Sequence, residues 1–188
     1  QELHRDRLFD AQWVTGDAFF GRNPPFRDGL PKDLLYLLDI PSDTRVWKKR
    51  PEVVVPPPSK KGRRQKKTRL KKGEPAAIPV SALVKDRSLN WQTVTMAHGA
   101  QGRIRAEIAR VRVVESRDSL PGKDLWLFLR RSLTDGHVKY HFSNAPEDIA
   151  LKEMIRVSVL RWPIELCFQE GKGEIGMDHY EHRSWDAW

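Results

Sequence analysis

The sequence has almost no cysteine, no long apolar run and no recognisable export signal. Its single cysteine, Cys167, can form neither an internal disulfide nor a cysteine-rich zinc site, which favours a reducing compartment. No stretch approaches the roughly 18 uninterrupted apolar residues of a membrane helix. The first residues, Gln1 to Asp6, have neither an initiator Met nor the layout of a signal peptide. We therefore expect a cytoplasmic chain without membrane insertion, cut from a longer sequence.

The 188 residues, 39% of them apolar and 31% charged, suit one globular domain with a real core or one domain with a smaller insertion. Their net charge of +9 comes from one place. Residues 59–72 hold nine of the 34 basic side chains and no acidic one, so the remaining 25 basic residues match 25 acidic ones. Such a run repels itself, and we expect it to be disordered until it meets a polyanion, for which nucleic acid is the obvious candidate.

The DNA-binding candidates in this run are Lys60, Lys61, Arg63, Arg64, Lys66 and Lys67. The alternative is a solubilising linker whose charge has no specific partner.

The first third of the chain reads as strand, crossover and strand. Residues Trp13 to Phe20 form an apolar segment around one acidic residue, Asp17, and Leu34 to Ile40 form a second apolar run. Phe26 to Leu38 would contain a short helix leading into that run. This order predicts a parallel strand pair in an α/β sheet.

The middle of the chain is rich in Val, Ile, Thr and Trp. We expect antiparallel strands at 91–96, 103–114 and 125–130, separated by Gly99, Gly102 and Pro121-Gly122. Residues 138–142 follow an Asp135-Gly136 turn and should form a hairpin with the preceding strand. A helix should open at Pro146, with Pro163 kinking or restarting it before residues 164–172.

The C-terminal helical segment carries the most informative spacing. Glu165 and Lys172 are two helical turns apart, and Arg161 precedes Glu165 by about one turn on the same side. A carboxylate between two cations suits a site where a metal held by the acid meets a phosphate held by the bases. The alternative is an ordinary amphipathic helix with intrahelical salt bridges.

Two motifs resemble those of bacterial insertion-sequence transposases of the DDE type, which have an RNase H-like core. The pattern R-x3-E-x6-K, with Arg161, Glu165 and Lys172, resembles their Y-x2-R-x3-E-x6-K signature, and residues 176–185 resemble the block that follows it. Residues 14–21 resemble the strand that carries their second catalytic aspartate, here Asp17. The two motifs occur in the family's order with a β-rich insertion between them.

Two departures from the family pattern stand out. The tyrosine of the signature is replaced by Ser158, which is shorter but keeps a hydroxyl. The family's first aspartate lies on an earlier strand, and Asp6 and Asp10 lie in a charged, helix-like stretch that does not resemble it. We therefore expect this chain to hold the second and third catalytic carboxylates without the first, and to be inactive alone.

The resemblance implies a mechanism, cofactors and partners. Asp17 and Glu165 would be catalytic residues and ligands of Mg²⁺, with Mn²⁺ as the alternative, and Arg161 and Lys172 would contact DNA phosphates. The reaction would be phosphodiester cleavage and strand transfer at the ends of a mobile element. The partners would be double-stranded DNA, at the element's ends and at the target, and a second copy of the chain.

Other candidate residues have weaker support. His179 and His182, and likewise His137 and His141, have no third metal ligand nearby in sequence and read as surface or packing residues. Trp91 or Trp126 could stack on a flipped base, but a core position is the simpler reading for each.

We thus expect a mixed α/β fold with an RNase H-like core interrupted by an antiparallel β insertion. The expected division is core in 1–47, a Pro-rich and basic disordered linker in 48–79, the insertion in 80–122 and the rest of the core in 123–188. Two other functions stay open: a non-catalytic nucleic-acid-binding protein, and an inactive remnant of a transposase.

Overall fold

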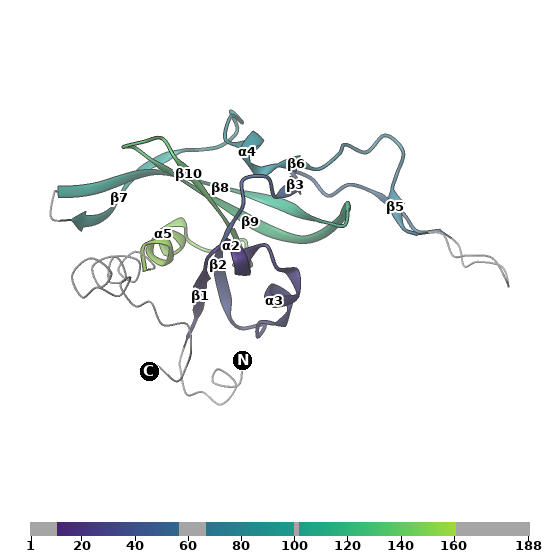
Figure 1. Cartoon of the computed structure of the whole chain (residues 1–188), viewed down its shortest axis with the longest axis horizontal. Coiled ribbons are helices and arrows are strands. Elements are labelled where there is room, and N and C mark those ends of the chain that lie inside the picture. Colours follow the sequence, from purple (N-terminus) through teal and green to yellow (C-terminus); the bar gives the residue numbers. More distant parts are fainter. Residues whose placement is uncertain (1–10, 57–66, 100–101, 161–188) are drawn as a thin grey trace, which may run out of the picture.

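The computed structural model describes residues 11–56, 67–99 and 102–160 (Figure 1). Within these ranges, one mixed sheet has the strand order β1-β2-β10-β9-β8-β3-β6, with β7 paired to β8, and β4 and β5 form a separate pair. The elements are β1 (Trp13–Gly16), α2 (Ala18–Gly21), α3 (Pro24–Gly29), β2 (Leu35–Ile40), β3 (Arg45–Trp47), β4 (Val53–Val54), β5 (Arg69–Leu70), β6 (Ile78–Pro79), α4 (Val80–Leu83), β7 (Gln92–Gly99), β8 (Gly102–Arg117), β9 (Leu120–Ser132), β10 (Val138–Ser143) and α5 (Leu151–Leu160).

The first two strands form the predicted parallel pair. Their register runs from Trp13 opposite Leu35 to Gly16 opposite Leu38. The short helices α2 and α3 form the crossover between them, as the strand, helix and strand pattern predicted. Strand β1 is the first in the sheet order, so it lies at an edge of the sheet within the described residues.

The long antiparallel part of the sheet is built on the β8–β9 hairpin. Its turn consists of Asp118 and Ser119, with φ angles of 49° and 63°, and Arg117 lies opposite Leu120. Two consecutive residues with positive φ give a two-residue turn that matches the twist of the strands. The expectation that Pro121-Gly122 separates these strands is wrong, because both residues lie inside β9.

Strand β10 joins the antiparallel part to the parallel pair. It pairs with β9 after a turn in which Gly136 has a φ of 70°, which confirms the predicted hairpin. It also pairs antiparallel with β2, where His141 lies opposite Asp39. The expected boundary between 122 and 123 falls inside β9, because β8 and β9 form one continuous hairpin. The remaining division of the chain into core and insertion stays a prediction.

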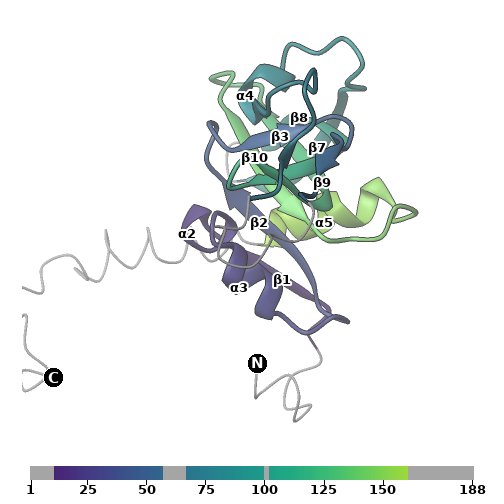
Figure 2. The ribbon, with the colours of Figure 1, turned by 90° about the vertical axis from the view of Figure 1, so that its right-hand side faces the viewer.

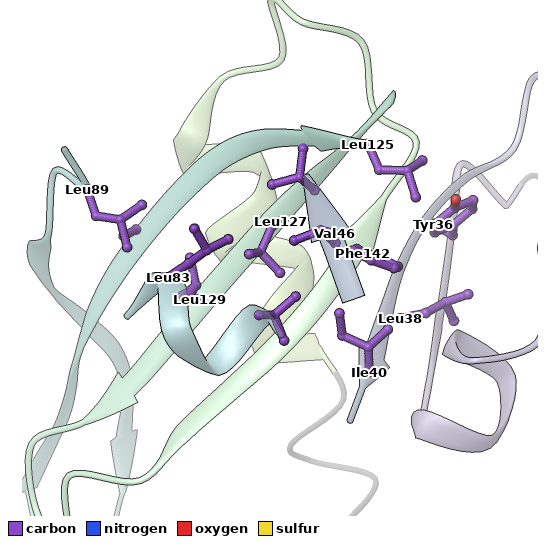
Figure 3. Close-up of a cluster of buried hydrophobic side chains, with 13 residues drawn as sticks. Tyr36, Leu38, Ile40, Val46, Leu83, Leu89, Leu125, Leu127, Leu129 and Phe142 are labelled. Carbon is purple, nitrogen blue, oxygen red and sulfur yellow. The ribbon is translucent and has the colours of Figure 1, made fainter. Parts of the chain in front are cut away.

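Each face of the sheet carries its own apolar cluster. On one face, residues of β2, β9 and β10 pack with Val80 and Leu83 of α4 (Figure 3). On the other face, Leu37 and Phe128 pack with Met154 and Val157 of α5. Figures 1 and 2 show α4 and α5 on different sides of the strands. The sheet is therefore the middle layer between these two helices.

The expectation of a disordered linker at 48–79 is wrong for its described ends. Strands β4 and β5 pair with each other, and β6 pairs with β3 in the main sheet. The indole Nε1 of Trp47 donates to the carbonyl of Pro75 at 2.8 Å, which fixes the returning chain. Such local pairing gives the backbone groups partners despite the nearby charge. Residues 57–66 lie outside the described part.

Helix α5 begins at Leu151, five residues later than the sequence suggested. Pro146 instead opens a turn, in which its carbonyl accepts from the backbone N of Ile149 at 3.3 Å and from Nε1 of Trp126 at 3.0 Å. The Pro146 carbonyl therefore accepts hydrogen bonds from a turn and from a side chain, and none from a helical backbone N–H. Among the helices of the described ranges, none combines the length and apolar character needed to cross a membrane.

Candidate functional site

Asp17 lies immediately after β1, at the carboxyl end of the parallel pair. Its backbone is extended, with φ −78° and ψ −177°, and its side chain caps α2 by accepting from the backbone N of Phe19 at 3.0 Å. The side chain is exposed. A capping carboxylate has a fixed orientation and still has lone pairs to offer. Asp17 can therefore present oxygen to a ligand at this edge.

Close packing of α2 on β2 fixes the position of Asp17. A Cβ added to Gly21 would lie 1.8 Å from the backbone oxygen of Asp39. Only glycine allows the helix to approach the strand this closely. The backbone N of Gly21 also donates to the carbonyl of Asp17 at 3.0 Å. The loop that carries Asp17 is thus held directly against the end of β2.

A second carboxylate lies at the same end of the neighbouring strand. Gly16 is opposite Leu38, so Asp17 and Asp39 each follow a paired residue of the parallel ladder. Asp39 is engaged by His141, whose Nδ1 lies 2.6 Å from the Asp39 Oδ1. Both residues lie on the face that α5 covers, since His141 packs against Phe128 at 5.6 Å between ring centroids.

Burial determines the protonation state of His141. Its side chain is only 6% exposed, and burial lowers its pKa below the ordinary value, against the opposing effect of Asp39. The neutral ring donates its Nδ1 proton to Asp39, which leaves Nε2 as an acceptor with no hydrogen-bond partner within the described residues. Nothing in the local sequence singles out His141, because its contact with Asp39 arises from strand pairing between residues 102 positions apart. His137, in contrast, is exposed at the β9–β10 turn.

Helix α5 packs beside β1 but is described only to Leu160. Trp13 of β1 packs against the apolar cluster to which Met154 and Val157 of this helix belong. Ser158, which replaces the signature tyrosine, is buried and donates its hydroxyl to the carbonyl of Ile155 at 2.7 Å. Its hydroxyl therefore has a partner inside the helix.

Most of the remaining candidate residues lie outside the described part. These are Arg161, Glu165 and Lys172, the basic residues Lys60, Lys61, Arg63, Arg64 and Lys66, and His179 and His182. Lys67 is described and exposed, just before β5.

The two tryptophans considered for base stacking are both half-buried and covered by arginines. The guanidinium of Arg110 lies 4.4 Å from the ring centroid of Trp126, with Arg112 at 5.3 Å. Arg131 lies 3.9 Å from the ring centroid of Trp91. Both rings pack against the core clusters as partly buried residues, in line with the simpler reading, and each ring already has a cation over it.

The described residues fit a divalent cation only in part. Asp17 supplies a hard carboxylate oxygen at an exposed, fixed position, which suits Mg²⁺. No group of three or more His, Cys, Asp or Glu side chains within the described ranges is arranged to hold a metal ion. Asp17 can thus be one ligand of a larger set.

Comparison with protein families gives the class. A family model described as "DDE superfamily endonuclease" matches residues 1–103, which include Asp17, Asp39 and the whole parallel pair. The chain belongs to this family. The mixed α/β sheet is consistent with its RNase H-like fold, and the assignment indicates a nuclease of the transposase type that acts on nucleic acid with divalent metals. Neither the curated proteins nor the solved structures contain a match.

Proposed function

We propose that this chain contributes to metal-dependent phosphodiester cleavage and strand transfer at the ends of a bacterial mobile element, acting in the cytoplasm on nucleoid DNA. The observation that carries the proposal is the position of Asp17. An exposed carboxylate, fixed at the carboxyl end of a strand in a parallel pair, lies within the segment matched to the endonuclease family. Ligands of open α/β sheets bind at this end of the strands.

Asp17 and Glu165 are the residues that would hold Mg²⁺, or Mn²⁺ in its place. The bound ions would supply Lewis-acid activation for an in-line phosphodiester displacement. The chain itself provides orientation: α2 fixes the Asp17 carboxylate through the Phe19 N–H, and Gly21 holds that helix on β2. Arg161 and Lys172 would bind phosphates near Glu165, as the sequence spacing suggests. A homodimer on paired DNA ends would complete the arrangement.

The carboxylate count limits what residues 1–188 do alone. Two cations a few ångströms apart repel unless anions lie between and around them. Asp17 and Glu165 are too few for this, and the Asp39 carboxylate is already engaged by His141. We therefore propose that these residues bind DNA without cleaving it, and that cleavage needs a third carboxylate from another segment. A nicking assay with Mg²⁺ or Mn²⁺ on DNA carrying the element's ends should show activity only in a chain extended upstream. Equal activity of the two chains would disprove this.

The role of Asp17 is tested in the extended chain. Asp17→Asn should abolish nicking and weaken Mn²⁺ binding measured by electron paramagnetic resonance, because the amide loses the charge that holds the ion. Asp118→Asn is the matched control, since Asp118 is exposed at a hairpin tip whose positive φ asparagine also tolerates. Nicking that survives Asp17→Asn would favour a non-catalytic DNA-binding protein.

The basic run would add affinity without sequence preference. Changing Lys60, Lys61, Arg63 and Arg64 to Gln should flatten the slope of log K against log salt by about 0.9 for each lost phosphate contact. The control changes the four exposed residues Lys32, Lys85, Arg87 and Lys152 to Gln. An unchanged slope in the basic-run variant would mean that the run is only a linker.

A further inference from the structure

A pocket of about 350 Å³ opens at the same edge of the sheet as Asp17, on the face opposite α5. Its walls come from the end of α2, from α3, from the loop after β2, and from β8 and β10. Phe142 lines it and belongs to the apolar cluster of the α4 face. The carboxyl ends of the two parallel strands, β1 and β2, both lead into this region, which is where open α/β sheets bind ligands.

The pocket is lined by three arginines, and one of them is buried. Arg27 is 6% exposed and pairs with Glu115, with Nη1 to Oε2 at 2.7 Å and Nη2 to Oε1 at 3.3 Å. Its Nε has no hydrogen-bond partner within the described residues. A buried N–H without a partner is unusual in a folded protein and needs a reason. Because this Nε is itself covered, Arg27 contributes its charge to the adjoining pocket and no direct hydrogen bond.

The other two arginines lie at the rim and are not neutralised. Arg22 and Arg45 are exposed and form no ion pair within the described ranges, and Nη1 of Arg45 is fixed by donating to the carbonyl of Ala77 at 2.9 Å. The acidic residues of the pocket are Asp43, which is exposed, and Glu115, whose carboxylate is already held by Arg27 and Arg117. The lining therefore has a positive excess.

We propose that this pocket binds one phosphate of the DNA backbone, with Arg22 and Arg45 as direct contacts and Arg27 as the charge behind them. Guanidinium groups match the oxygens of a phosphate in geometry and charge, and Thr44 and Ser116 add hydroxyl donors to the lining. The volume suits a single phosphate with its sugar. This inference rests on the proposed function, and it gives the duplex a second contact on the other side of the edge from Asp17.

The first test measures the binding of a short DNA duplex by fluorescence anisotropy at several salt concentrations. Arg22→Gln with Arg45→Gln should flatten the slope of log K against log salt by about 0.9, as expected for one lost phosphate contact. The matched control is Lys85→Gln with Arg87→Gln, which removes two exposed charges elsewhere and should change the slope by less than half as much. Equal changes in the two variants would overturn the proposal.

The second test follows the Arg27 Nε–H resonance by NMR, in the wild type and in the Arg22→Gln single variant, whose exposed substitution preserves folding. Both inorganic phosphate and the DNA duplex should shift this resonance in the wild type, and much less in the variant. A shift with phosphate but not with the duplex would mean that the pocket takes free phosphate, which overturns the DNA assignment. If neither phosphate nor the duplex shifts the resonance, the pocket does not bind an anion and the proposal is wrong. Because the readout is binding alone, failure here is distinguishable from failure of the Asp17 nicking test.

Discussion

Two pairs of polar side chains connect the first third of the chain to the long antiparallel sheet, and they differ in kind. On the α4 side, Arg27 pairs with Glu115 of β8. On the α5 side, Asp39 pairs with His141 of β10. The first pair joins two side chains of opposite charge, and Arg117 and further ion pairs extend it to the surface at Asp28. The second contains a ring that burial keeps neutral. The comparison predicts that the connection on the α5 face depends on pH through His141.

The largest expected effect comes from breaking the Arg27 pair. Glu115→Ala should lower the free energy of unfolding by about 3–5 kcal/mol, because it leaves the Arg27 charge buried without its partner. Glu107 is the control on the same strand: it pairs with Arg131 at 3.0 Å but is half-exposed, so Glu107→Ala should cost about 0–1 kcal/mol. Urea unfolding measures both values. Similar losses in the two variants would mean that burial does not distinguish the pairs.

The Arg27 pair also depends on a glycine across the hairpin. A Cβ added to Gly122 would lie 2.7 Å from Cγ of Glu115, so Gly122→Ala should displace that side chain and cost about 1–3 kcal/mol. Lys123→Ala, which removes only an ion pair to Asp28 at 2.7 Å, should cost less than about 1 kcal/mol in the same unfolding experiment. A Gly122→Ala variant as stable as wild type would show that Glu115 moves freely.

The Asp39 pair should make stability depend on pH. Burial lowers the pKa of His141 below 6.5 in the folded state, while Asp39 of β2 opposes this shift and Arg130 and Lys139 support it. The unfolded chain therefore binds a proton first as pH falls. Stability is complete above about 6.5 and declines below it, toward the folded pKa, by at most about 1.4 kcal/mol per pH unit.

The measurement is urea unfolding between pH 7.5 and 5 for wild type, His141→Gln and His137→Gln. The His141 variant should lose this decline, whereas the His137 variant should keep it, because His137 is exposed. If the stability of His141→Gln still declines as the pH falls, groups other than His141 cause the decline.

The smallest effect is expected at the surface of α5. Arg156 pairs with Glu153 three residues before it, at 2.6 Å, and Arg156 is exposed. Arg156→Ala should cost about 0.2–0.5 kcal/mol, as is usual for such helical pairs. Thermal unfolding in low and high salt would show this small difference disappearing as salt screens it. A loss as large as that of Glu115→Ala would mean that α5 depends on this pair.

Local patterns predicted the elements that are local in sequence. The parallel pair followed from two apolar runs around a crossover, and the β9–β10 hairpin followed from Asp135-Gly136, where glycine adopts the positive φ. The β8–β9 turn was predicted at the wrong place, because a Pro-Gly pair such as Pro121-Gly122 is a stronger turn signal in sequence than Asp118-Ser119. Gly122 instead makes room for the side chain of Glu115 across the hairpin. The need for glycine at position 122 thus comes from a tertiary contact, which the local sequence cannot predict.

Asp17 was also predicted locally, from the resemblance of its strand, and the family match includes it. Its role as a metal ligand and its meeting with Glu165 stay predictions. Arg27 with Glu115 and Asp39 with His141 could not have been predicted, since each joins residues about 90 to 100 positions apart through strand register. Register depends on the whole sheet, and a shift of one residue would move every side chain to the other face.

The contact between Gly21 and β2 has a consequence for how this gene can vary. Every other amino acid carries a Cβ, which would lie 1.8 Å from the Asp39 carbonyl oxygen, so each missense change at that codon introduces a clash. In a saturation mutagenesis library selected for activity, we expect substitutions to be as rare at Gly21 as at Asp17, although Gly21 offers no chemical group. Selection would then preserve two neighbouring positions for unrelated reasons: one for its oxygen atoms, the other for the absence of a side chain.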